Sequence, residues 1–153
     1  MGKSKNYNNA DLIESEYIAM KDLESVVGEP IPLVQTINWE IFGFVASDNH
    51  VTRLGLYNRG LNALPDTICS LSSLKGLWLG DNNLNTLPEQ IGDLKSLKIL
   101  NLSGNNLKVF PDSILSLISL EQVWLGGIKI SSLPNIAKKW LKQLRNNGCT
   151  IYK

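Results

Sequence analysis

The chain has 153 residues, of which 43% are hydrophobic, and its formal net charge at pH 7 is +1. This length and composition suit one globular domain, and no apolar run approaches the roughly 18 residues that a membrane-spanning helix requires. The two cysteines, Cys69 and Cys149, are too few and too distant in the sequence for a disulfide framework or a metal-binding knuckle. We therefore expect a cytoplasmic protein with no membrane partner.

Residues 1–8 are polar, and we expect them to be disordered. A helix is predicted to begin near Asp11, whose carboxylate can cap the first turn, while Glu14 completes a capping-box pattern. Gly28 and the prolines after it are expected to end this helix. Its apolar residues fall on one face at helical spacing: Leu12, Ile13, Ala19, Met20, Leu23, Val26 and Val27.

A β-hairpin is predicted after this helix. Residues 41–45 have the pattern of a short strand, 47–49 that of a turn, and 51–56 that of the returning strand. His50, the one histidine of the chain, is then interpreted as a solvated turn residue. We expect residues 9–50 to form an N-terminal cap that covers the apolar edge of the central part of the chain.

A 23-residue repeat fills this central part, with copies at 51–73, 74–96 and 97–119 and a partial copy at 120–134. Leucine-like residues recur at positions 1, 4, 6 and 11 of each unit, and the alternation at 4 and 6 predicts a strand. A Leu-Pro pair or its equivalent then begins a short helical turn. Each unit is therefore predicted to form one coil of a solenoid.

Position 9 of the repeat holds an asparagine in the two central copies. The buried amides of Asn82 and Asn105 are expected to bond backbone groups that the tight turn leaves unpaired. Arg59 and Ile128 occupy the same position in the first and last copies. We therefore expect a ladder of asparagines that is incomplete at both ends.

The repeat resembles that of leucine-rich repeat proteins, specifically the intracellular class with the pattern L-x-x-L-x-L-x-x-N-x-L-x-x-L-P-x-x-I-x-x-L-x-x. Asn38 and Trp39, followed by an aliphatic strand at 43–45, resemble the cap that precedes many such arrays, which implies a structural role for Trp39. The resemblance implies an α/β fold, a right-handed leucine-rich repeat solenoid with a parallel sheet on its concave face, helical turns on its convex face and a cap at each end. It also implies an interaction module, such as a signalling scaffold or regulator.

Residues 135–153 are predicted to form a C-terminal cap made of a helix and a short closing strand. Trp140 is expected to face inward with its apolar neighbours, and Gly148 to end the helix. The outward face carries the basic residues Lys138, Lys139, Lys142 and Arg145. A helix that binds an anionic partner remains an alternative, although nothing aromatic interleaves these charges and we expect no nucleic acid.

No phosphate loop, metal-ligand cluster or nucleophile motif appears, so we expect neither an enzyme nor a cofactor.

Positions 3, 5, 7 and 8 of each unit point outward from the sheet and are not needed for the coil. Trp78 and Trp124 are predicted to lie about 10 Å apart on one exposed row, on either side of Asn101. Glycines at 80, 104, 126 and 127 are expected to leave room for a partner.

These positions predict a concave surface that binds a protein or peptide, because tryptophan and tyrosine are enriched in interface hot spots. Two alternatives stay open: the aromatic residues only cover the short sheet, or the chain pairs through its concave face or its caps into a homodimer. We therefore expect a monomer or a weak homodimer. The predicted partner-binding residues are Trp78, Trp124, Asn101, Ile99, Arg53, Tyr57, Asp81 and Gln122.

Overall fold

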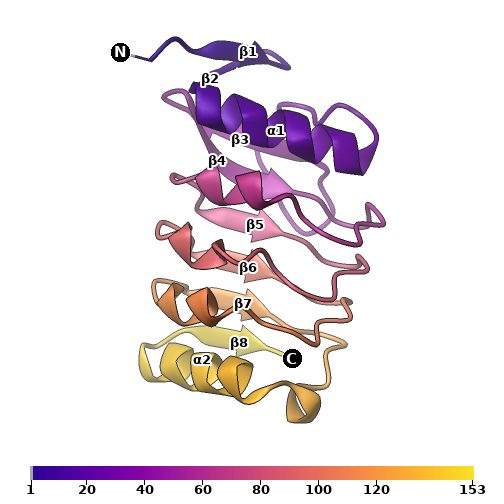
Figure 1. The fold of residues 1–153 in the computed structure, drawn as a ribbon, viewed down its shortest axis with the longest axis vertical. Helices are drawn as coiled ribbons and strands as arrows, with labels where there is room; N and C mark the ends of the chain where they lie inside the picture. The colour runs from indigo at the N-terminus through magenta and orange to yellow at the C-terminus, as the bar shows by residue number, and fades with distance from the viewer. Residues whose placement is uncertain (1) are drawn as a thin grey trace.

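The computed structural model describes residues 2–153, which form a stack of coils with the two termini at opposite ends (Figure 1). Six strands make one sheet in the order β3-β4-β5-β6-β7-β8. The first pair is antiparallel, and every later pair is parallel. The strands are β3 (Gly43–Ser47), β4 (His50–Gly55), β5 (Gly76–Trp78), β6 (Ile99–Asn101), β7 (Gln122–Trp124) and β8 (Thr150–Tyr152).

The 23-residue period sets the register of this sheet. Gly76 of β5 pairs with Ile99 of β6, which pairs in turn with Gln122 of β7. The leucine-like residues at positions 4 and 6 are buried in every coil, from Leu54 and Leu56 to Val123 and Leu125. The opposite side of the stack carries the 3₁₀ turns Asp66–Ser70, Ile91–Asp93, Asp112–Ser116 and Ile130–Ser132.

The asparagines at position 9 bond the backbone between coils. The Asn82 amide donates to the carbonyls of Leu56 and Leu79, and its oxygen accepts from the backbone N–H of Leu61. Asn105 repeats this arrangement one coil later. Each buried amide therefore supplies both a donor and an acceptor to turns that a 23-residue coil leaves without strand partners.

The prediction that residues 1–8 are disordered is wrong for the part that forms a strand, while Met1 lies outside the described residues. β1 (Lys5–Tyr7) and β2 (Ala10–Leu12) pair as an antiparallel hairpin around Asn8 and Asn9, which have φ values of 44° and 72°. Asparagine tolerates these left-handed angles better than most residues. The hairpin is held because the Tyr7 ring is buried against the following helix and sheet.

The helix α1 (Glu14–Val27) begins later than predicted, and no side chain caps it. Asp11 belongs to β2 and accepts a hydrogen bond from Asn6 instead. Gly28, with a φ of 87°, ends the helix as predicted. Val26 is predicted to face inward but is 48% exposed, since the helix covers the end of the stack with one narrow face only.

Glu16 is the buried charged residue of α1, with no exposed side-chain surface. Its carboxylate accepts a hydrogen bond of 2.6 Å from the backbone N–H of Val51 and lies 2.9 Å from His50 Nδ1. The interpretation of His50 as a free turn residue is therefore wrong. The helix places a charged acceptor over a backbone donor of β4 and over the histidine beside it, so both are satisfied.

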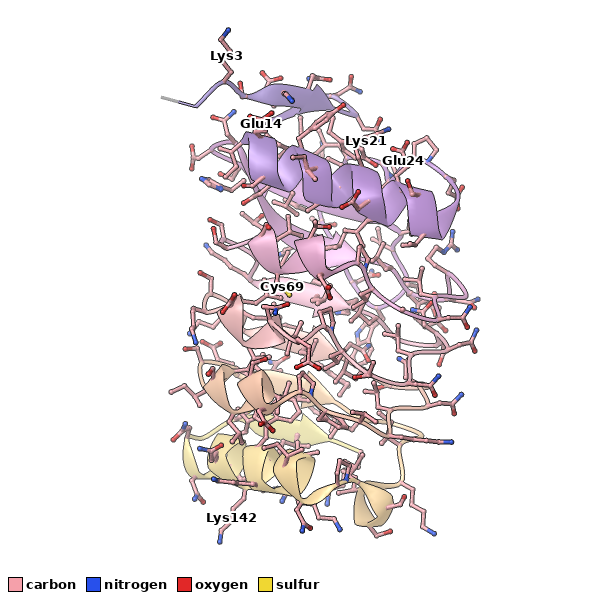
Figure 2. The ribbon with its side chains drawn as sticks, viewed as in Figure 1. Lys3, Glu14, Lys21, Glu24, Cys69 and Lys142 are labelled. Carbon is pink, nitrogen blue, oxygen red and sulfur yellow. The ribbon has the colours of Figure 1, made fainter. Side chains whose placement is uncertain are left out.

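The helix α2 (Asn135–Asn146) closes the other end of the stack. Trp140 is buried, and its indole N–H donates to the carbonyl of Leu117 at 3.1 Å. Gly148, with a φ of 85°, turns the chain into β8. The lysines and arginine of this helix are exposed, and Figure 2 shows Lys142 pointing away from the stack. Within residues 2–153, no helix is long and apolar enough to cross a membrane.

Candidate partner-binding site

Residues 33–42, here called the cap segment, lie across the concave face of the sheet. The segment is anchored beside β3, where the Val34 N–H donates to the carbonyl of Phe44 at 2.9 Å. The Ile41 carbonyl and the Ile37 side chain then lie over Gly55 of β4. Further on, the Trp39 ring reaches Trp124 of β7, with 4.9 Å between ring centroids. Part of this chain therefore already occupies its own concave face.

The row of side chains at position 5 is mostly buried by this arrangement. Trp78 is only 6% exposed and Asn101 only 3%. The prediction that Trp78 and Trp124 form an open row on either side of Asn101 is therefore wrong for the first two of these strands. The cap segment lies over Gly55 of β4 and reaches Trp124 of β7, so we attribute this burial to its path across the strands between them.

Three aromatic rings form a cluster at the far end of this row. Trp124 stacks on Tyr152 of β8 with a centroid distance of 4.6 Å and an interplanar angle of 12°. The rings of Trp39 and Trp124 meet nearly edge-on, with an interplanar angle of 81°. Such offset and edge-to-face contacts are favourable aromatic geometries. The cluster holds the cap segment in place, and it leaves the Trp39 side chain 51% exposed.

Gly76 and Gly104 of the concave face make room for this chain's own side chains, whereas a Cβ on Gly126 or Gly127 would meet only ordinary contacts. A Cβ on Gly76 would collide with the Trp78 ring, and one on Gly104 would collide with the Asp81 carboxylate. The expectation that Gly104 clears space for a partner is therefore wrong. A Cβ on Gly80 would lie 3.2 Å from the Tyr57 ring, and Gly80 also lines an open hollow between the cap segment and the sheet.

Position 8 of the repeat is conformationally constrained, although the repeat pattern predicts that it is free to vary. Asn58, Asp81, Gly104 and Gly127 stand there in successive coils, and their φ values are 50°, 53°, 66° and 78°. Only glycine, asparagine and aspartate adopt this region readily. The signal was present in the sequence, since no other residue type occupies that position.

The hollow has a volume of about 280 Å³. Trp39 and Glu40 form one side of it, and Tyr57 and Asp81 form part of the rest. The Tyr57 hydroxyl donates to Asp81 Oδ2 at 2.7 Å, and this bond raises the pKa of Tyr57 above its ordinary value of 10.0, with the negative charge of Asp81 adding to the effect. The residues that line the hollow are Trp39, Glu40, Tyr57, Gly80, Asp81, Asn101 and Ser103.

The structure brings together only some of the predicted partner-binding residues. Tyr57, Asp81 and Asn101 line the hollow, and Trp124 supports Trp39 at its edge. The predicted residues at position 3 lie outside it, on the neighbouring row of the sheet: Arg53, Ile99 and Gln122.

The prediction of binding residues omits four lining residues, Trp39, Glu40, Gly80 and Ser103, although Gly80 was expected to leave room for a partner. The resemblance implies a purely structural role for Trp39, whereas half of its side chain is open to solvent. The outward position 7 of the repeat was a usable signal for Ser103. Nothing in the sequence indicated that Glu40 would lie beside it.

Other features of the described residues offer less for binding or chemistry. A hollow of about 510 Å³ runs from Asn106 to Lys129, but no aromatic side chain lines it. No group of three or more histidine, cysteine, aspartate or glutamate residues within 2–153 is placed to hold a metal ion. Burial raises the pKa of the Cys69 thiol to about 11, which disfavours the nucleophilic thiolate.

Comparison with known families assigns the fold to a class. The model for the leucine-rich repeat region matches residues 44–147, and the chain therefore belongs to the leucine-rich repeat proteins. This fold is typical of non-enzymatic protein–protein interaction modules. The match does not reach residues 1–43, so their assignment to the N-terminal cap of the family remains a prediction, as does the intracellular class.

Among solved structures, the chain is similar to a leucine-rich repeat protein of Leptospira interrogans, with 31% identity and a TM-score of 0.57. That likeness covers 67% of this chain but only 25% of the Leptospira protein, so this chain spans about a quarter of its length. The leucine-rich repeat ectodomain of the receptor kinase SOBIR1 from Arabidopsis thaliana shares the fold, at 24% identity and a TM-score of 0.53 over 90% of this chain and 77% of that one. A search of curated proteins finds no match.

Proposed function

We propose that this protein is an interaction module that binds a protein or peptide on its concave face, at the hollow between the cap segment and the sheet. The observation that carries this proposal is the exposed Trp39, which packs on Trp124 and lines the hollow together with the Tyr57–Asp81 pair. Tryptophan and tyrosine beside a pocket are the residues most often found in interface hot spots.

The mechanism is rigid presentation. Trp39 rests on Trp124, and the Tyr57 hydroxyl is bonded to Asp81, so both aromatic side chains are ordered before a partner arrives. Beneath them, the Ser103 N–H donates to Asn101 Oδ1, and the Ser103 hydroxyl accepts from the N–H of Gly126. A partner that binds this surface avoids most of the entropic cost of ordering it.

The test is affinity capture of partners from the source cells with the immobilised full chain. Trp39→Ala and Tyr57→Ala should each weaken binding of a captured partner at least tenfold, which corresponds to about 1.4 kcal/mol. Ile118→Ala is the matched control, because Ile118 is also half exposed but lies outside the concave face. Capture that survives both aromatic substitutions would contradict the proposal.

The same experiment examines the anionic-partner alternative. Lys138, Lys139 and Lys142 are exposed together on α2, and their triple reversal to glutamate should leave capture unchanged if the concave face binds the partner. Loss of capture in that variant, with retention in Trp39→Ala, would instead assign binding to the basic helix.

We further propose a cytoplasmic scaffold or regulator, supported by the two free cysteines, Cys69 and Cys149. Self-association is a second candidate, because β8 is the last strand of the sheet and its outer edge pairs with no other strand of residues 2–153. Light scattering over a range of concentrations distinguishes a monomer from a weak homodimer.

A further inference from the structure

The hollow carries two acidic groups that form no ion pair within the part of the chain that the structure describes. Glu40 and Asp81 both line it, and neither forms an ion pair with any residue of 2–153. The nearby Arg59 is engaged elsewhere: its guanidinium lies 2.9 Å from Glu29 and 4.6 Å from the centre of the Phe42 ring. The hollow is therefore negative, and no cation within residues 2–153 pairs with its acidic groups.

The Asp81 carboxylate is held in position rather than free to turn. Its Oδ2 accepts the Tyr57 hydroxyl at 2.7 Å, and its other oxygen lies over Gly104, where any side chain would displace it. A carboxylate offers about four acceptor sites, so this single hydrogen bond leaves capacity for a second donor. A partner's cation would find this acceptor preorganised.

Aromatic side chains line the hollow beside these charges. Trp39 and Tyr57 line the hollow together with Glu40 and Asp81, and they come from the cap segment and the first coil. A cation near an aromatic face is attracted by the ring, and the attraction adds to that of the carboxylates. The combination suits a group that is both flat and positively charged.

We propose that the hollow binds an arginine side chain of the partner. The guanidinium is planar, stacks on aromatic rings and carries five donors, so it can contact an aromatic wall and a carboxylate at the same time. A lysine ammonium would satisfy the charge but would not use the flat faces as well. This inference rests on the proposed function, since it names the chemistry that the same site recognises.

The test uses the ¹⁵N-labelled full chain and N-acetyl-arginine methylamide as the probe, followed by NMR. The indole N–H of Trp39 and the side-chain amide of Asn101 should shift in a saturable way in the millimolar range, as suits so small a ligand. The citrulline analogue has almost the same shape without the charge, and it should bind at least fivefold more weakly. The lysine analogue should also bind more weakly than arginine.

Two conservative variants locate the binding. Asp81→Asn and Glu40→Gln remove the charges while keeping the size of each side chain, and asparagine also tolerates the φ of 53° at position 81. Both should weaken the arginine probe at least threefold. Glu89→Gln, an exposed acid outside the hollow, is the control and should leave binding unchanged.

Equal affinity for arginine and citrulline, or no shift at Trp39 in a chain whose spectrum is otherwise folded, would overturn the inference. The capture experiment distinguishes this outcome from a failure of the proposed function. If captured partners depend on Trp39 and Tyr57 but the arginine probe does not bind, the binding face stands and only the arginine assignment falls. If capture is insensitive to both aromatic residues, the proposed function itself falls.

Discussion

Tyr7 joins the N-terminal hairpin to α1 and to the chain that follows it. Its buried hydroxyl donates to Glu24 Oε2 at 2.8 Å and accepts from the backbone N–H of Ile31 at 3.1 Å. Burial raises the pKa of Tyr7 above its ordinary value of 10.0, because the phenolate is poorly solvated there, and the bond to the Glu24 carboxylate raises it further. One hydroxyl therefore links three segments.

This arrangement predicts a loss of stability at high pH. The unfolded chain releases the Tyr7 proton near pH 10 while the folded chain retains it, so the contribution is present below pH 10 and is lost as the pH rises above that value. Tyr7→Phe should lower the free energy of unfolding at pH 7 by about 1–3 kcal/mol. In the same variant, the free energy of unfolding should fall less between pH 10 and 11 than it does in the wild type, as measured by urea unfolding.

Tyr17→Phe is the matched control, because the Tyr17 ring packs on Tyr7 while its hydroxyl makes no hydrogen bond within residues 2–153. The free energy of unfolding of Tyr17→Phe should fall above pH 10 as much as that of the wild type. An equal decline in Tyr7→Phe would show that other groups cause the loss of stability.

Among the elements, the cap segment depends on the absence of a side chain at Gly55. The Ile41 carbonyl lies against the position that a Cβ would take there. We predict that Gly55→Ala displaces the segment, costs about 1–3 kcal/mol of stability and exposes Trp78, whose indole N–H should then exchange faster with water in NMR experiments.

Gly126→Ala provides the comparison for this prediction. Gly126 also lies at the outward side of the sheet, but its nearest neighbour, Ser103 Oγ, is 3.4 Å from the place of a Cβ, which is an ordinary contact. In Gly126→Ala, the Trp78 indole N–H should exchange with water at the wild-type rate. If Gly55→Ala kept Trp78 equally protected, the segment would not be what buries it.

The elements also show what periodicity can predict. The leucine positions recur every 23 residues, so the strands and their register, such as Leu77 beside Leu100, could be deduced from the sequence. The path of the cap segment could not, because it depends on contacts such as Trp39 with Trp124 between residues far apart in the chain. Residues 1–8 are polar, and their hairpin is stabilised by contacts with later elements, such as the burial of Tyr7 and the hydrogen bond from the Asn8 amide to the Ile31 carbonyl.

The part of the candidate site that belongs to the repeat could be predicted, and the part that belongs to the cap segment could not. Tyr57, Asp81 and Asn101 belong to the repeat, and their outward positions follow from it. Trp39 and Glu40 come from the cap segment, whose place over the sheet has no periodic signal. The same segment explains why Trp78 is buried, since a sheet side chain is open only if nothing else in the chain covers it.

At the scale of the whole molecule, the cap segment links coils that would otherwise contact only their neighbours. In a simple solenoid each repeat packs on the next, and a substitution weakens mainly its own coil. Here Trp39 from the N-terminal part contacts Trp124 of β7, which stacks on Tyr152 of β8. The two ends of the stack are therefore joined across its concave face.

This link predicts a long-range effect of Trp124→Ala. Removing the central ring of the cluster should cost about 2–4 kcal/mol, somewhat less than a fully buried tryptophan, because Trp124 is only partly buried. Backbone amides of the cap segment and of β8 should both lose protection in hydrogen-exchange mass spectrometry. Val109→Ala, at an exposed site, should change neither. Loss of protection confined to β6, β7 and β8, with the cap segment unchanged, would show that the coils act as independent repeats and that the cap segment is held by contacts other than the aromatic cluster.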